Sequence, residues 1–209
     1  MISLKTTDLS CIRDDRLLFK QLNIDLLAGQ LLLVEGENGS GKTSLLRILC
    51  GIRLPEQGEV IWQNQHGEAA SVHAQGHYNG EMAFLGHQDG NKLDLTVVEN
   101  LSFTQSLALK NTCDIEDVLN RVGLAFFDDI FVSNLSAGQR RRLAIARLLL
   151  SGASLWVLDE PFTAMDTKGV AMVEREIGRH LQQGGLVIMT SHHQVSVNPE
   201  SLIKINLSQ

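Results

Sequence analysis

Eight consecutive residues, Gly36 to Thr43, have the types and spacing of a phosphate-binding loop. The glycines of this stretch let the backbone turn tightly and bring successive N–H groups against an anion. Lys42 would reach the β- and γ-phosphates of a nucleotide, and Thr43 would give its hydroxyl to Mg²⁺. The stretch therefore predicts a nucleoside triphosphate site with a magnesium ion.

The flanking segments favour this interpretation over an ordinary glycine-rich turn. Leu31–Val34 is a short apolar run typical of a buried strand, and Thr43–Leu49 has the pattern of a helix start. A strand, a glycine loop and a helix follow one another in the order that phosphate binding requires.

A second group of candidates follows the apolar run that begins at Leu155. Asp159 and Glu160 end this predicted strand. Because neighbouring side chains of a strand point to opposite sides, we expect the two acids to have different targets. Asp159 suits the shell of the magnesium ion, and Glu160 suits the attacking water. The alternative is a pair of solvated acids at a strand end.

Two further segments could also reach a phosphate. A polar stretch containing Ser136 and Gly138 opens a strongly helical run that ends near Leu150. It is either a second anion-binding helix start or a plain capped helix. His192 follows the buried run Leu186–Met189, at the end of a strand where α/β proteins hold their ligands.

Composition limits the remaining possibilities. A chain of 209 residues suits one α/β domain. The net charge of −6 gives no electrostatic footprint for nucleic acid. No apolar run approaches the roughly 20 residues that span a bilayer, and the start of the chain is not expected to be a secretory signal. Cys11, Cys50 and Cys113 have no metal-ligand spacing and are expected to be reduced.

The rest of the chain is predicted to form alternating strands and helices, interrupted by a polar segment. The segment from Asn64 to Glu81 carries His66, His73 and His77, and it is interpreted as a solvated surface loop rather than a metal site. Further elements are predicted as strands over 1–9, 22–27, 59–62, 82–88 and 202–207, the last at a sheet edge, and as helices over 97–103, 114–119 and 168–182.

With these residues identified, the chain resembles the ATP-binding-cassette (ABC) ATPases over essentially its whole length. The family's motifs occur in order: the phosphate loop Gly36–Thr43, a Q-loop glutamine at Gln88, the signature Leu135–Gln139, the strand 155–159 with Glu160, a D-loop around Asp166, and an H-loop histidine at His192.

The resemblance implies an α/β fold with a P-loop NTPase (RecA-like) core of mixed sheet, an inserted α-helical subdomain and an N-terminal antiparallel β subdomain. It implies one ABC ATPase domain over 1–209. The core and the β subdomain would occupy about 1–92 and 151–209, and the helical subdomain, with the signature helix, about 93–150.

The resemblance also implies roles for single residues. Glu160 would polarise water, His192 would contact the γ-phosphate, and Gln88 would sense Mg²⁺ and water. Two copies would pair head to tail, so that the signature of one closes on the nucleotide of the other. The residues expected to bind ATP are Gly36, Glu37, Asn38, Gly39, Ser40, Gly41, Lys42, Thr43, Ser44, Arg13, Ser136, Gly138 and Gln139, and those expected to hold Mg²⁺ are Thr43, Gln88 and Asp159.

The sequence departs from the family pattern at two positions. Ala137 stands where the family usually has a second glycine of the signature. Arg13 stands where many members stack an aromatic side chain on adenine. The guanidinium plane could stack on the base, or the arginine could simply face solvent in a turn.

Within the family the chain is most similar to the small ATPase subunits of cytochrome c maturation (haem export) systems. That likeness implies integral membrane transporter subunits as partners, a homodimer, and a peripheral place on the cytoplasmic face of the bacterial inner membrane. The alternatives are the ATPase of another small-molecule transporter, and a non-transport ABC ATPase of DNA repair or translation. Such non-transport proteins usually carry a second cassette, a coiled-coil arm or basic extensions.

Overall fold

A computed structural model of the chain describes residues 1–74, 80–108 and 113–208. Its strands are β1 (Ser3–Arg13), β2 (Arg16–Leu27), β3 (Leu31–Glu35), β4 (Gln57–Gln63), β5 (Ala69–Ser71), β6 (Met82–Leu85), β7 (Leu155–Asp159), β8 (Leu186–Thr190) and β9 (Leu202–Asn206). Its helices are α1 (Lys42–Leu49), α2 (Val97–Leu107), α3 (Ile115–Val122), α4 (Ala137–Leu150) and α5 (Thr167–Gln182), with 3₁₀ turns η1 (Val132–Asn134) and η2 (Pro199–Ser201).

A five-stranded sheet in the order β6-β7-β8-β3-β9 forms the centre of the molecule. All its neighbouring strands pair in parallel. The antiparallel pairs lie in a second sheet, in the order β2-β1-β4-β5. The α/β class is therefore confirmed. Parallel and antiparallel pairs both occur, as expected, but they lie in two separate sheets, and the central sheet is entirely parallel.

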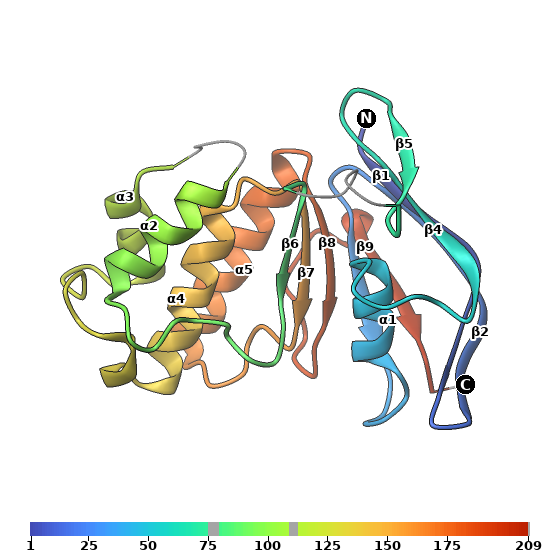
Figure 1. The fold of residues 1–209 in the computed structure, drawn as a ribbon, viewed down its shortest axis with the longest axis horizontal. Coiled ribbons are helices and arrows are strands. Elements are labelled where there is room, and N and C mark those ends of the chain that lie inside the picture. The colour runs from blue at the N-terminus through green and yellow to red at the C-terminus, as the bar shows by residue number, and fades with distance from the viewer. Residues whose placement is uncertain (75–79, 109–112, 209) are drawn as a thin grey trace.

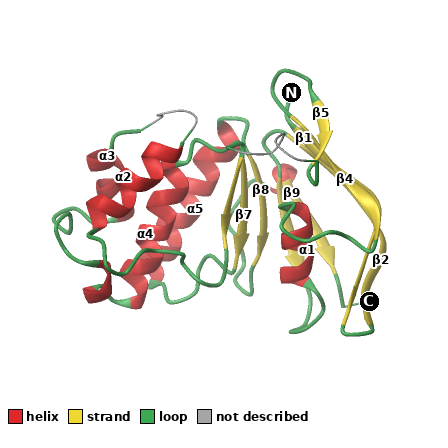
Figure 2. Cartoon of the chain, in the orientation of Figure 1, coloured by secondary structure: helices red, strands yellow, loops and turns green. Residues whose placement is uncertain are grey.

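The elements are arranged in layers (Figure 1). Helix α1 lies between the central sheet and the antiparallel sheet, whereas α4 and α5 cover the other face of the central sheet (Figure 2). Alternate residues of each central strand enter two separate cores. In β7, Leu155 and Val157 join the core around α1, and Trp156 and Leu158 join the core around the other helices. A sheet buried on both faces explains why these strands read as unbroken apolar runs.

Most predicted elements are present, and several are longer than their patterns indicated. The first strand continues to Arg13, where a turn at Asp14 and Asp15 leads into β2. The segment predicted as one surface loop from residue 64 contains β5, which pairs with β4. Its three small residues have no apolar alternation, so no strand could be predicted there.

The histidines of that segment have separate environments. His66 is exposed and lies beside Gln65, while Nε2 of His73 is 2.9 Å from the carbonyl oxygen of Arg53. The third, His77, lies outside the described residues.

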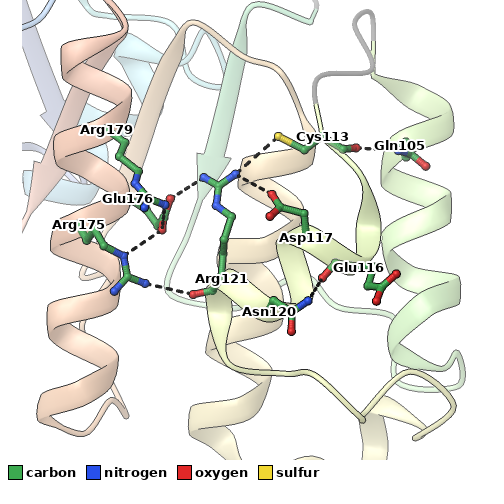
Figure 3. A network of polar contacts seen from close by, with 9 residues as sticks. All are labelled: Gln105, Cys113, Glu116, Asp117, Asn120, Arg121, Arg175, Glu176 and Arg179. Carbon is green, nitrogen blue, oxygen red and sulfur yellow. Dashed lines mark hydrogen bonds and ion pairs between the residues drawn. The ribbon is translucent and has the colours of Figure 1, made fainter.

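Ionic contacts connect the helices that cover one face of the central sheet. Glu176 of α5 is 1% exposed and is bound by Arg121 of α3 and by two arginines of its own helix, Arg175 and Arg179 (Figure 3). A carboxylate buried to this extent needs paired charges, and these arginines supply them. The contact therefore holds α3 against α5.

His180, near the end of α5, is packed more tightly than the other histidines just described. Its ring stacks on Trp156 with centroids 3.9 Å apart, and Nε2 lies 3.2 Å from the carbonyl oxygen of Ser154. Burial lowers the pKa of His180 from 6.5 to about 4, because the charged form would lose its hydration. The imidazole is therefore neutral at pH 7.

This burial predicts acid sensitivity. Between pH 6.5 and 4 the unfolded chain binds a proton that folded His180 does not, so stability falls as the pH falls through this window. Linkage gives a loss of about 2 kcal/mol between pH 7 and pH 5 from this residue. His180→Phe, which keeps a ring on Trp156, should remove that part of the loss in urea denaturation. His66→Gln is the matched control, and an equal slope in wild type and His180→Phe would contradict the assignment.

Candidate nucleotide site

The predicted phosphate loop and the two acids meet at one edge of the central sheet. Strands β3, β7 and β8 are neighbours and parallel, so the segments that follow them come together at their carboxyl ends. A cavity of about 580 Å³ lies there. It is lined by Arg13, Leu18, Asn38, Gly39, Gly41, Lys42, Thr43, Ser44, His87, Asp159, Glu160, Thr163 and His192.

The loop between β3 and α1 is shaped to receive an anion. Gly41 caps α1 in the left-handed region, at φ 103°, and no side chain caps that helix start. Its first N–H groups are therefore left for a ligand. The Nζ atom of Lys42 donates to the carbonyl oxygens of Gly36 (2.7 Å) and Glu37 (3.0 Å), and Ser40 Oγ is buried with no hydrogen-bond partner among the described residues. These features fit a phosphate group.

Asp159 joins the loop to the neighbouring strands. Its carboxylate is buried and accepts hydrogen bonds from the hydroxyls of Thr43 (2.9 Å) and Thr190 (2.8 Å). The alternation of β7 explains this direction, because Asp159 is in phase with Leu155 and Val157 and thus points to the α1 side. Hydroxyl and carboxylate oxygens are the donors that Mg²⁺ prefers, so this pair fits a magnesium ion.

Glu160 directly follows the last residue of β7 and lines the same cavity as Asp159, but it has different partners. Its backbone is in the left-handed region, at φ 51°, and its N–H donates to Thr190 Oγ1 at 2.9 Å. The carboxylate lies toward His192, whose Nε2 is 3.5 Å from Oε1. That oxygen is buried and has no hydrogen-bond partner within the described part of the chain. A carboxylate with a free acceptor at the cavity can take a proton from a water molecule.

Other predicted residues lie outside this cavity or at its margin. Gln88 is exposed and does not line the cavity, whereas its neighbour His87 does. Arg13 lines it beside the turn and forms an ion pair with Asp14 at 3.3 Å.

The signature residues form the start of α4. Ser136 and Gln139 make a reciprocal capping box, in which Ser136 Oγ accepts from the N–H of Gln139 (3.2 Å) and Gln139 Oε1 accepts from the N–H of Ser136 (2.8 Å). Gly138 lies against the D-loop, since a Cβ there would be 3.0 Å from the carbonyl oxygen of Ala164. None of the three lines the cavity of their own chain.

Several residues at the site were not singled out by the sequence, among them His87 and Thr190. His87 lines the cavity, and Thr190 organises both acids by donating to Asp159 and accepting from Glu160. Thr190 could have been predicted from the sequence. It follows Leu186 and Ile188 in the same alternation of β8, and the side chains of this set face α1. A hydroxyl at the end of a buried strand needs a partner in the site.

No helix within residues 1–74, 80–108 and 113–208 combines the length and apolarity needed to cross a membrane.

Comparisons with known proteins agree with this geometry. The family model described as ABC transporter matches residues 19–163. Among curated proteins, the chain is similar to the cytochrome c biogenesis ATP-binding export protein CcmA of Aliivibrio fischeri, with 42% identity over 99% of this chain and 100% of the relative. The proteins of the same name from Methylococcus capsulatus (47%; 96% and 95% covered) and Escherichia coli K12 (43%; 99% and 97% covered) are similarly close.

Solved structures give the same result for the fold. A putative ABC transporter ATP-binding protein from Pyrococcus furiosus superimposes with a TM-score of 0.81 at 26% identity, over 98% of this chain and 97% of that one. Together with the phosphate loop, the paired acids and the near full-length relatives, this shows that the chain is an ATP-binding ABC ATPase that belongs to the ABC transporter family and, within it, to the CcmA-like proteins.

Proposed function

We propose that this chain is the ATP-hydrolysing subunit of a membrane transporter complex for haem export in c-type cytochrome biogenesis. The observation that carries the proposal is the identity of 42–47% over nearly the whole chain to proteins named for cytochrome c biogenesis. In such a complex, hydrolysis drives a conformational change in the membrane subunits. The ATPase of a different small-molecule transporter is the alternative, and the partner distinguishes the two.

The phosphate loop and α1 bind the triphosphate. Lys42 neutralises the β- and γ-phosphates, and the uncapped start of α1 adds N–H donors and the positive end of its macrodipole. Thr43 and Asp159 would hold the magnesium ion, and Gln88 is the further ligand that the family resemblance implies. When bound, Mg²⁺ supplies positive charge that offsets the charge developing on the phosphates.

Glu160 acts as the general base. Its carboxylate takes a proton from water as the water oxygen bonds to the γ-phosphorus and the bond from phosphorus to the leaving oxygen breaks. His192, 3.5 Å from that carboxylate, contacts the γ-phosphate and holds the geometry. The hydrogen bond from the Glu160 N–H to Thr190 keeps the base at this position.

The signature acts across a dimer. Ser136 is exposed at the start of α4, and neither it nor Gly138 or Gln139 lines the cavity of the same chain. A second copy, placed head to tail, brings this helix start to the γ-phosphate bound by its neighbour. The membrane subunits dock beside the helical elements and keep the ATPase on the cytoplasmic face of the inner membrane, and Gln88 transmits the state of the nucleotide to them.

Two substitutions separate binding from chemistry. Glu160→Gln should lower kcat by on the order of 10²-fold or more, because general-base catalysis is lost. ATP binding should remain, and a closed dimer should accumulate on size-exclusion chromatography with Mg·ATP. Lys42→Ala should lose binding and hydrolysis together.

The double variant Ser136→Arg/Glu160→Gln tests whether the dimer forms through the signature. It should abolish the ATP-dependent dimer while each subunit still binds ATP. Turnover of Glu160→Gln at the wild-type rate would refute the role of the base, and loss of ATP binding in the Ser136→Arg variant would refute the cross-dimer role.

The cytochrome assignment is tested in the host. Deletion of the gene should abolish covalent holo-cytochrome c, detected by haem staining of membrane proteins. Wild-type protein should restore it, and Lys42→Ala should not. Normal cytochrome c in the deletion strain would remove the haem assignment and leave the ATPase assignment intact.

A further inference from the structure

Arg141 is the most deeply buried arginine among the described residues and binds more groups than any motif residue discussed above. It lies in α4, two positions after the signature glutamine, and is 3% exposed. Its guanidinium donates to five acceptors: the carbonyl oxygens of Gly86 (2.9 Å), Asp159 (3.0 Å), Glu160 (2.7 Å) and Pro161 (3.2 Å), and Asp89 Oδ1 (3.0 Å).

These acceptors belong to two segments that carry proposed catalytic groups. Asp159, Glu160 and Pro161 form the end of β7 and the turn beyond it, where Glu160 has its left-handed backbone. Such a conformation is costly for a residue with a Cβ and persists only when neighbouring contacts hold it. Arg141 and the Thr190 hydroxyl supply those contacts, through the carbonyl and the N–H of Glu160 respectively.

The other two acceptors flank Gln88. Arg141 binds the carbonyl of Gly86, two positions before Gln88, and the carboxylate of Asp89, one position after it. Asp89 is also the one acidic side chain that pairs with Arg141 among the described residues, and so it offsets the buried charge. The Gln88 segment is therefore held from both sides by the same guanidinium that holds Glu160.

We propose that Arg141 is a positioning residue for hydrolysis, which fixes the general base and the Gln88 segment relative to each other and to the signature helix. This inference rests on the proposed function. A displacement of α4 moves Arg141, and with it the carbonyls of both segments. The geometry of the base thereby follows the position of the signature helix.

The fork geometry of arginine is required for this role. A guanidinium directs five N–H donors along fixed directions in one plane, whereas an ammonium has three rotatable donors at one point. Lysine at position 141 keeps the charge and the ion pair with Asp89. It cannot serve two backbone segments at once.

Arg147, six residues further along α4, provides a matched control. It binds the carbonyls of Asp89 and Gly90 and the side chain of Asn91, and within the described part of the chain it makes no hydrogen bond to the end of β7. Arg147→Lys therefore disturbs the segment after Gln88 without releasing the base.

The test compares Arg141→Lys, Arg147→Lys and wild type by steady-state ATPase kinetics and by titration with a fluorescent ATP analogue. We expect Arg141→Lys to lower kcat by on the order of tenfold or more, because a small misplacement of the base is costly. The affinity for the analogue should stay within about twofold, since the phosphate loop is untouched. Arg147→Lys should keep a larger share of kcat.

Hydrogen exchange supplies a readout that does not depend on activity. Backbone amides in residues 86–91 and 159–165 should exchange faster in Arg141→Lys than in wild type, while those in 36–44 should not. Unchanged kcat in Arg141→Lys, or a loss of kcat equal to that in Arg147→Lys, would overturn the inference. Wild type that hydrolyses no ATP would instead overturn the proposed function.

A variant with a smaller effect covers the case in which Arg141→Lys does not fold. Asp89→Ala removes the partly exposed carboxylate and leaves the carbonyl contacts of Arg141 in place. It should lower kcat several-fold with unchanged analogue affinity. A kcat equal to that of wild type would then overturn the inference.

Discussion

The hydrogen bond from Thr43 to Asp159 connects the two halves of the nucleotide site. Thr43 belongs to α1 and Asp159 to β7, 116 positions apart in the chain. The bond is possible because β3 and β7 run parallel on either side of β8 and end at the same edge. Thr190, at the end of β8, binds the same carboxylate and the N–H of Glu160. Three adjacent strand ends thus place the loop, the proposed metal ligand Asp159 and the proposed base Glu160.

Local chemistry could be predicted from the sequence because it depends on neighbouring residues. The phosphate loop, the capped helix starts and the apolar central strands all follow from residue type and spacing within short windows. The direction of Asp159 toward α1 also followed, since alternation along a strand needs no tertiary information. The structure agrees on these points.

What the sequence could not supply depends on pairing between distant segments. Three small residues of β5 become a strand only because β4 is beside them. The parallel character of the central sheet depends on which strands become neighbours. Arg141 had a local signal, since it stands four positions before buried Ile145 and seven before Leu148 on the apolar side of α4. Its partners, however, come from two other regions of the chain.

Helix α1 is enclosed by the two sheets, and its apolar residues Leu45, Leu46, Ile48 and Leu49 are fully buried. The phosphate loop is consequently joined at its carboxyl end to a helix that is closely packed between two sheets. The segment around Gln88 and the turn that carries Glu160 are instead joined to α4 through the side chain of Arg141, so we expect movement at the site to involve these polar contacts. A bound triphosphate would therefore rest on a closely packed helix, while the groups that act on it would be held by polar side-chain contacts.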